Sequence, residues 1–233
     1  MYDYEEVCPV SRAASILCER WTLQIVREML FGASRFSDLQ KYLPKLSPTL
    51  LNTRLKTLEQ QGIVIRTRIA EKRGYEYRLT PCGLALRAVV EAMGKWGMQW
   101  AFDDMDAEQL NVSVIVRDFA VALNLDQLPS GDTTLQFNVA TSGEKIRKFI
   151  LVRDRAPQVC DENIGHEVDV YLSADLETLA KIWYGKLALR TALESGRLSA
   201  VGSAPYVQRI HHWLGRSQFA DVQPQSGPAL QAE

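Results

Sequence analysis

Apolar and polar positions alternate with the period of an α-helix through most of the first hundred residues of the chain. This spacing predicts five helices, at residues 9–18, 21–32, 35–44, 47–62 and 81–102. Between the last two helices, two β-rich segments flank a turn at Arg73-Gly74 and predict a hairpin. Its packed face is expected to carry Ile63, Ile65, Tyr77 and Leu79. The pattern therefore predicts a helical N-terminal domain with one hairpin, over residues 7–102.

The pattern changes after a short acidic segment at residues 103–109, which is expected to link two domains. A helix-like stretch at 112–125 follows this segment. Alternating apolar residues then predict strands at 134–140 and 168–173. The continuous apolar run at 148–152 predicts a strand that is covered on both faces.

Three further helices are expected near the end of the chain, at residues 175–183, 189–196 and 204–215. Strands followed by helices are typical of an α+β domain in which helices cover one face of an antiparallel sheet. This second domain is expected to span 110–219, and residues 220–233 are expected to form a disordered tail. The 233 residues are enough for two such domains.

The two halves of the chain differ in charge, although the net charge is only −1. Residues 1–100 carry 15 basic and 10 acidic side chains, whereas residues 101–233 carry 12 basic and 18 acidic side chains. A basic half favours a nucleic-acid partner for that half. Two solvated surfaces that merely differ in charge are the alternative.

The composition also indicates the cellular compartment of the protein. No apolar run approaches the roughly 18 residues that a membrane span needs. The acidic N-terminus lacks the basic segment followed by an apolar segment that is typical of a signal peptide. The four cysteines are scattered and show no metal-ligand spacing, which suits a reducing compartment. We therefore expect a cytoplasmic protein with no membrane partner, no metal and no cofactor.

The helix at 47–62 has the composition of a helix that reads DNA. Leu51, Leu55 and Leu58 fall on one side of it, and its other side carries hydrogen-bonding groups. Such groups near the start of a helix suit base edges and phosphates. The candidate DNA contacts on this helix are Ser47, Thr49, Asn52, Thr53 and Lys56.

Basic residues gather around this helix and along the hairpin, where they can reach phosphates. The candidate phosphate contacts are Arg35, Arg54, Arg66, Lys72 and Arg73. Arg54 lies close to the leucine side of its helix, so a role in bracing two helices is its alternative. A small α/β domain with a basic surface is the alternative to DNA binding as a whole.

The long helix at 81–102 carries one broad apolar stripe, formed by Val89, Met93, Trp96 and Trp100. Most such stripes pack inside their own chain. This one ends a small domain and holds two tryptophans, so a homodimer seam is a serious competitor. Ile16 and Leu17 of the first helix are expected to contribute to that seam.

The same segments resemble a known family. The pieces "CPV", "RW", "IVRE", "RFSDL", "LSPTLLNTRLKTLEQQG" and "YRLTPCG", within residues 8–97, resemble the HxlR-type winged helix-turn-helix transcription regulators. The resemblance implies a dimeric, cytoplasmic, bacterial-type regulator with a recognition helix at 47–61 and a wing at 63–79. It also implies that the first helix and the 81–102 helix build the dimer.

The later segment resembles a different module. The order of residues in "DVYLSADLETLAKIWYGKLALRTALESGRLSAVGSAPYVQRIHHWLG" is similar to that of sterol carrier protein-like domains. This resemblance implies a five-stranded sheet with helices around an apolar cavity, and hence a small apolar ligand. The candidate pocket residues are Phe137, Phe149, Trp183 and Trp213, and an ordinary filled core is their alternative.

Cys8 precedes Pro9 at the start of the first helix, where a helix N-terminus lowers the pKa of a thiol. Some regulators of the resembled type sense oxidants or electrophiles through a cysteine here, which makes Cys8 a candidate redox sensor. An inert packed cysteine is the alternative.

The sequence contains no nucleophile motif, phosphate loop or dinucleotide fingerprint, so no enzyme is expected. We expect a dimeric DNA-binding transcriptional regulator, modulated by a small apolar ligand in its C-terminal domain. The alternatives are a lipid or small-molecule carrier with secondary DNA binding and a scaffold that only dimerises.

Overall fold

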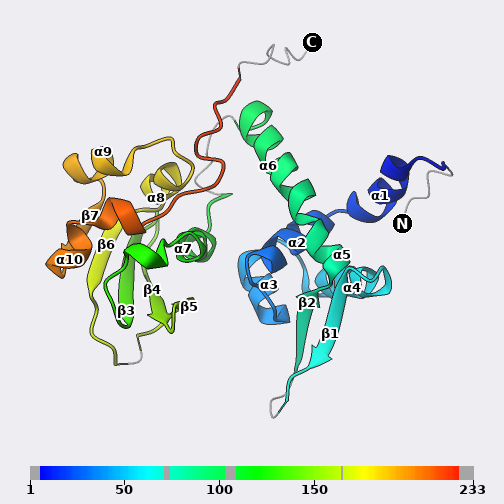
Figure 1. Cartoon of the computed structure of the whole chain (residues 1–233), viewed down its shortest axis with the longest axis horizontal. Coiled ribbons are helices and arrows are strands. Elements are labelled where there is room, and N and C mark those ends of the chain that lie inside the picture. The colour runs from blue at the N-terminus through cyan, green and yellow to red at the C-terminus, as the bar shows by residue number, and fades with distance from the viewer. Residues whose placement is uncertain (1–5, 71–73, 103–108, 164, 226–233) are drawn as a thin grey trace. The chain divides into compact units, whose positions relative to one another are not determined.

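The computed structural model describes residues 6–70, 74–102, 109–163 and 165–225 of the chain (Figure 1). It divides into two compact units, Met1–Gly94 and Lys95–Glu233. The division falls inside a long helix, ahead of the linker that the sequence suggests at 103–109. Most of that linker, and the last eight residues of the expected tail, lie outside the described residues.

Helices and one hairpin form the first part of the chain. The helices are α1 (Pro9–Leu17), α2 (Thr22–Leu30), α3 (Phe36–Tyr42), α4 (Pro48–Gln60), α5 (Pro81–Ala85) and α6 (Arg87–Trp100). The hairpin consists of β1 (Val64–Arg68) and β2 (Tyr75–Leu79), which pair antiparallel. The segment at 81–102, expected to be one helix, forms two helices, because the first helix ends at Ala85 and Leu86 separates it from the second.

The core of the first unit forms around α4. Leu51, Leu55 and Leu58, here called the leucine stripe, are completely or almost completely buried. They lie in one apolar cluster with Ile25 of α2 and Leu39 of α3. The helical period predicted for residues 47–62 thus places the leucines where the sequence suggests.

The hairpin packs on this core by one face only. Val64 pairs with Leu79 and Arg66 with Tyr77, so these residues share a face, and Val64 and Tyr77 are buried. Ile65 lies on the opposite face and is 54% exposed, so its expected place on the packed face is wrong. Ile63, just ahead of β1, is buried as expected, and within the strand it is Val64 that takes the packed face in place of Ile65.

The second unit is built from a sheet and helices. Its helices are α7 (Val112–Val121), the short 3-10 helix η2 (Leu125–Gln127), α8 (Leu176–Trp183), α9 (Leu189–Glu194), α10 (Ala204–Val207) and α11 (Ile210–Trp213). Its strands are β3 (Thr133–Ala140), β4 (Lys145–Arg153), β5 (Ala156–Cys160), β6 (Val170–Asp175) and β7 (Ser199–Gly202). The α+β class is confirmed, and β5 and β7 are strands that the sequence pattern did not predict.

The five strands lie in the order β5-β4-β3-β6-β7. Every neighbouring pair is antiparallel except β3 and β6, which run parallel. The expectation of an antiparallel sheet is thus wrong at its centre. On β4, the four residues Phe149–Val152 are all buried, which confirms a strand covered on both faces.

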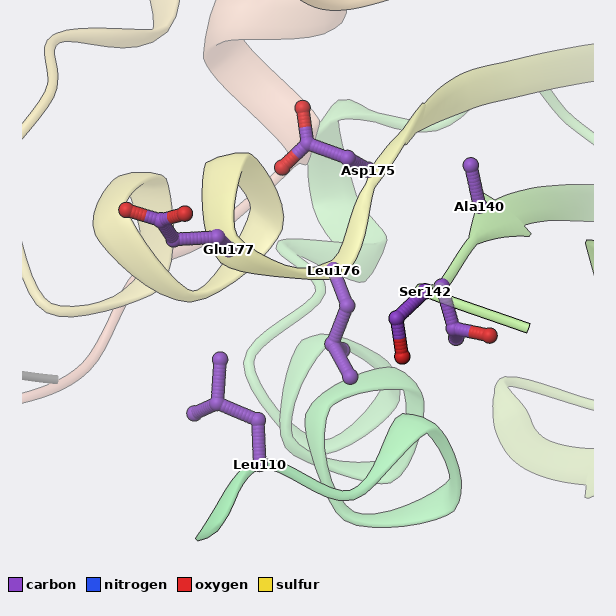
Figure 2. Close-up of a pocket in the computed structure, with 7 residues that line it drawn as sticks. Leu110, Ala140, Ser142, Asp175, Leu176 and Glu177 are labelled. Atoms are coloured by element: carbon purple, nitrogen blue, oxygen red, sulfur yellow. The ribbon is translucent and has the colours of Figure 1, made fainter. Parts of the chain in front are cut away.

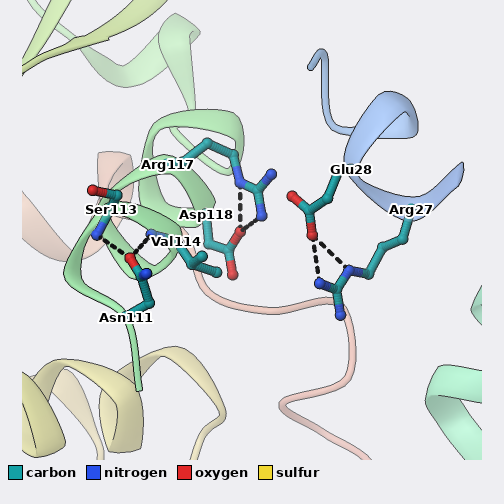
Figure 3. Close-up of polar contacts among 7 residues, drawn as sticks. All are labelled: Arg27, Glu28, Asn111, Ser113, Val114, Arg117 and Asp118. Atoms are coloured by element: carbon teal, nitrogen blue, oxygen red, sulfur yellow. Dashed lines mark hydrogen bonds and ion pairs between the residues drawn. The ribbon is translucent and has the colours of Figure 1, made fainter. Parts of the chain in front are cut away.

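Polar side chains cap α7 and pair with buried carboxylates in both units (Figure 3). The side-chain oxygen of Asn111 accepts hydrogen bonds from the backbone N–H groups of Ser113 and Val114, at 2.8 and 3.2 Å, and so caps α7. Within α7, Arg117 pairs with Asp118 at 2.8 Å. Within α2, Arg27 pairs with the buried Glu28. Each of these buried carboxylates thus has a guanidinium beside it, as burial of charge requires.

Candidate nucleic-acid interface

A tight turn joins α3 to α4 and sets the direction of α4. Leu43 and Leu46 in this turn are buried, and the side-chain amide of Gln40 donates a hydrogen bond of 2.8 Å to the carbonyl of Leu46. Ser47 caps α4 by accepting a hydrogen bond from the backbone N–H of Leu50, and Pro48 occupies the first turn. Two helices joined in this way form a helix-turn-helix unit.

The face of α4 opposite the leucine stripe is open to solvent. It exposes Thr49, Thr53 and Lys56, and the remaining candidate contacts, Asn52 on the flank of the helix and Ser47 at its N-cap, are exposed as well. The hydroxyl of Thr53 donates to the carbonyl of Thr49 at 3.0 Å. The structure therefore brings together, near the start of one helix, the hydrogen-bonding groups that the sequence marked as DNA contacts.

The side chain of Arg54 is largely covered by a neighbouring segment. Its Nη2 lies 2.8 Å from a carboxylate oxygen of Glu19, and its Nε donates to the carbonyl of Arg20 at 2.9 Å. Only 16% of its side chain is exposed. Of the two roles considered for Arg54, the structure shows the brace: it ties α4 to the segment between α1 and α2.

The other candidate phosphate contacts lie around α4. Arg35 precedes α3 and is exposed, and its backbone N–H donates to the carboxylate of Asp38 at 2.9 Å. Arg66 on β1 is exposed and lies over the ring of Tyr75, with its Cζ 3.5 Å from the ring centroid. Lys72 and Arg73 lie outside the described residues.

Tyr75 is a surface residue that the sequence reasoning missed. It is 45% exposed on the hairpin face that carries Arg66, and its ring lies against that guanidinium. The strand register is what places Tyr75 beside Arg66: Tyr75 pairs with Arg68, which lies two residues beyond Arg66 and therefore on the same face. A register of this kind depends on the pairing of distant residues, which periodicity along one strand does not reveal.

The apolar stripe of α6 is exposed. Exposed fractions are 40% for Val89, 53% for Met93, 62% for Trp96 and 44% for Trp100. Ile16 and Leu17 of α1 are half-buried, and α1 has no buried residue at all. The α6 stripe therefore leaves apolar surface uncovered in a single chain, whereas Ile16 and Leu17 pack partly against the core of the first unit.

Cys8 lies at the N-cap of α1 and is exposed. The backbone N–H groups of Ser11 and Val10, at the first turn of the helix, favour the thiolate and lower the pKa of the thiol. The chemistry therefore suits the reactive cysteine that the sequence suggests, and redox sensing stays a prediction. No cluster of His, Cys, Asp or Glu with the makings of a metal site occurs among the residues described.

The four aromatic residues proposed for a ligand pocket are buried in the second unit. Phe119 of α7 stacks on Phe137 and meets Trp183 edge-on, with ring centroids 5.8 and 5.4 Å apart. Trp213 is completely buried and belongs to the same apolar cluster. Phe149 pairs with Gln136 and so lies on the other sheet face from Phe137. The four side chains do not line a common space.

A depression with a volume of about 430 Å³ lies elsewhere in this unit (Figure 2). It is formed where β3 ends and α8 begins. The lining residues are Leu110, Ala140, Thr141, Ser142, Asp175, Leu176 and Glu177. Asp175 and Glu177 are both engaged, Asp175 as the cap of α8 and Glu177 in an ion pair with Lys181. The side chains of Leu110 and Leu176 form an apolar part of its wall.

Comparison with known proteins identifies the first part of the chain. Residues 16–105 match the profile of the HxlR-like helix-turn-helix family. The uncharacterized HTH-type transcriptional regulator YvaP of Bacillus subtilis is 41% identical over 100 residues, which is 42% of this chain and 93% of YvaP. The chain belongs to the HxlR-like helix-turn-helix transcriptional regulators.

The chain is also similar to a second regulator, for which a solved structure exists. The HTH-type transcriptional regulator YodB of Bacillus subtilis is 36% identical over 96 residues, which is 40% of this chain and 86% of YodB. The solved structure of reduced YodB covers 40% of this chain and 92% of that chain, with 36% identity and a TM-score of 0.36.

The second part of this HxlR-like regulator matches another family. Residues 121–215 match the SCP-2 sterol transfer family, so a sterol carrier-like domain follows the helix-turn-helix domain. No helix among the described residues combines the length and the apolar character that crossing a bilayer demands.

The brace formed by Arg54 predicts an effect on stability. Replacing Arg54 with alanine removes two bonds to Glu19 and Arg20, one of them between charges, and should lower the free energy of unfolding by about 1–2 kcal/mol. Urea denaturation of the full chain measures this change. Lys56→Ala removes an exposed cation from the same helix and should change stability by less than about 0.5 kcal/mol. Equal effects of the two substitutions would contradict the brace.

Proposed function

We propose that this HxlR-like regulator is a cytoplasmic homodimer that binds a double-stranded DNA operator through α4. The observation that supports it is the composition of the solvent face of α4. That face presents Thr49, Asn52, Thr53 and Lys56 on a helix whose opposite side is anchored by the leucine stripe. Such groups match the donors and acceptors of the major groove, and a helix in this setting fits that groove.

The positive surroundings of α4 support the same proposal. Arg35 and Arg66 are exposed cations at the start of α3 and on the hairpin, and Lys56 lies on α4 itself. Cations in these places supply affinity through phosphates and leave sequence preference to the base contacts. The protein acts in this proposal by binding and not as an enzyme. A carrier with secondary DNA binding is the rival, and a mobility-shift assay with promoter fragments separates the two, because a carrier retains no fragment preferentially.

The proposed phosphate contact of Arg66 predicts a change in salt dependence. Arg66→Ala should weaken binding to operator and to random DNA alike. It should also flatten the slope of log affinity against log salt by about 0.9 for each phosphate that the side chain neutralises. Fluorescence anisotropy across a salt series measures both. Arg190→Ala, an exposed arginine on α9, is the matched control and should leave the slope as it is. An unchanged slope for Arg66→Ala would remove the hairpin from the interface.

The apolar stripe of α6 supports the homodimer. Val89, Met93, Trp96 and Trp100 are between 40% and 62% exposed and recur along one helix. Contiguous exposed apolar surface of this kind marks an interaction site, and two copies of a helix stripe cover each other. A dimer also places two copies of α4 on one duplex, which half-sites about one helical turn apart accommodate.

A charge placed in this stripe should separate the subunits. Met93→Lys introduces an unpaired cation at the middle of the seam and should shift sedimentation from dimer to monomer, with weak operator binding. Val201→Lys, at an exposed apolar position on β7, is the control and should remain dimeric. A wild-type chain that sediments as a monomer would end the dimer proposal.

We place the ligand of the sterol carrier-like domain in the depression between β3 and α8. Its volume of about 430 Å³ lies within the range of small-molecule sites, roughly 300–1,000 Å³. Leu110 and Leu176 favour an apolar molecule there. Regulation requires that this molecule bind one state of the dimer more tightly than another, because equal affinity for both states shifts nothing.

A thermal-shift screen of apolar metabolites on the full chain tests this site. At a concentration of about 100 times Kd, a ligand adds about 2.7 kcal/mol of stability and should raise Tm measurably. Leu176→Asp should abolish the rise, and Val201→Lys should keep it. Operator titration with each stabilising compound then reports coupling. Stabilisation without a change in operator affinity would leave a ligand site that does not regulate, and Leu176→Asp with a full response would place the ligand elsewhere.

A further inference from the structure

The hydroxyl of Thr53 is committed to its own helix. It donates to the carbonyl of Thr49, one turn earlier, at 3.0 Å. A threonine hydroxyl has a single proton, so this bond removes the only donor that the Thr53 side chain has. What remains for a partner outside the helix is the methyl group and an acceptor lone pair. Thr53 is exposed on the face of α4 opposite the leucine stripe, so the methyl group is available there.

The side chain of Asn52 is in the opposite situation. It is exposed on the same helix, and the hydrogen bonds among the described residues do not involve its amide. A free amide offers one acceptor and two donors side by side. This arrangement matches adenine in the major groove, which presents the N7 acceptor beside the N6 donor.

We propose that these two residues select A·T pairs: Thr53 packs its methyl group against the C5 methyl of a thymine, and Asn52 binds an adenine through N6 and N7. The methyl of thymine is the one apolar group that the major groove presents, and a threonine methyl is among its usual partners. Because Asn52 and Thr53 are successive residues of one helix, about 100° apart around its axis, they read neighbouring positions of one half-site. This inference rests on the proposed function of α4 and adds the bases that α4 recognises.

The experiment uses the full chain and modified DNA. Duplexes retained from a random-sequence library supply the probe. Each thymine of the best duplex is replaced in turn by deoxyuridine, which removes only the C5 methyl, and each adenine by 7-deazaadenine, which removes the N7 acceptor. Affinity is measured for the wild type, Thr53→Val, Thr53→Ser and Asn52→Ala. Valine keeps the methyl and loses the hydroxyl, whereas serine does the reverse.

One thymine in each half-site should respond to deoxyuridine by a loss of about fourfold, the equivalent of leaving one methyl unburied. Thr53→Val keeps a methyl group and should keep the response to deoxyuridine at that thymine. Thr53→Ser should lose about the same factor on the unmodified duplex and no longer respond to deoxyuridine at that position. Asn52→Ala should lose its response to 7-deazaadenine at a neighbouring pair.

Two results would overturn the inference while leaving DNA binding intact. One is a duplex that is bound selectively and yet responds to deoxyuridine at no thymine. The other is a reversed pattern, in which Thr53→Ser binds normally and Thr53→Val does not, because the hydroxyl would then be the reading group. If the library yields no preferred duplex, the proposed function of α4 fails, and the inference fails with it.

Discussion

Burial of the leucine stripe of α4 decides what the N-terminal unit can present to a partner. Each buried leucine is worth about 1.5–3 kcal/mol against exposure, so turning the helix about its axis would expose side chains that now fill the core. The polar face of α4 is outward because the leucines must be inward. The turn from Leu43 to Leu46 and the hydrogen bond from Gln40 then set where the helix starts. The groups that α4 presents to solvent are therefore set by the packing of its leucines.

Arg54 shows how that constraint acts at the edge of the buried side. Its position next to the leucines places a long cationic side chain against the segment before α2, where Glu19 and the carbonyl of Arg20 accept its donors. The same cation further round the helix would face solvent, as Lys56 does. The position of Arg54 around the helix axis left both roles open, because that position does not show which residues of another segment lie opposite it. Only the fold brings residue 19 to residue 54.

Local features of this chain could be predicted from sequence, and features that join distant residues could not. The leucine period and the apolar run on β4 each depend on a few neighbouring residues, and each agrees with the structure. The face of Ile65 and the parallel pairing of β3 with β6 depend on register and topology. Phe137 and Trp183 are a related case: the sequence shows that they are aromatic, and only the structure shows that they pack against Phe119. Exposure of the α6 stripe likewise needed the whole chain, because periodicity is the same for core and surface.

The parallel pair at the centre of the sheet has a consequence for synthesis of the protein. The first unit is N-terminal, so it leaves the ribosome first. Strand β3 must wait for β6, which begins 30 residues after β3 ends, because β4 and β5 occupy the other side of the sheet. Until then one edge of β3, with Leu135, Phe137 and Val139, is an open template for strands of other chains. The helix-turn-helix half of a nascent chain is therefore synthesised before the stretch in which this edge of β3 is open to pairing with another chain.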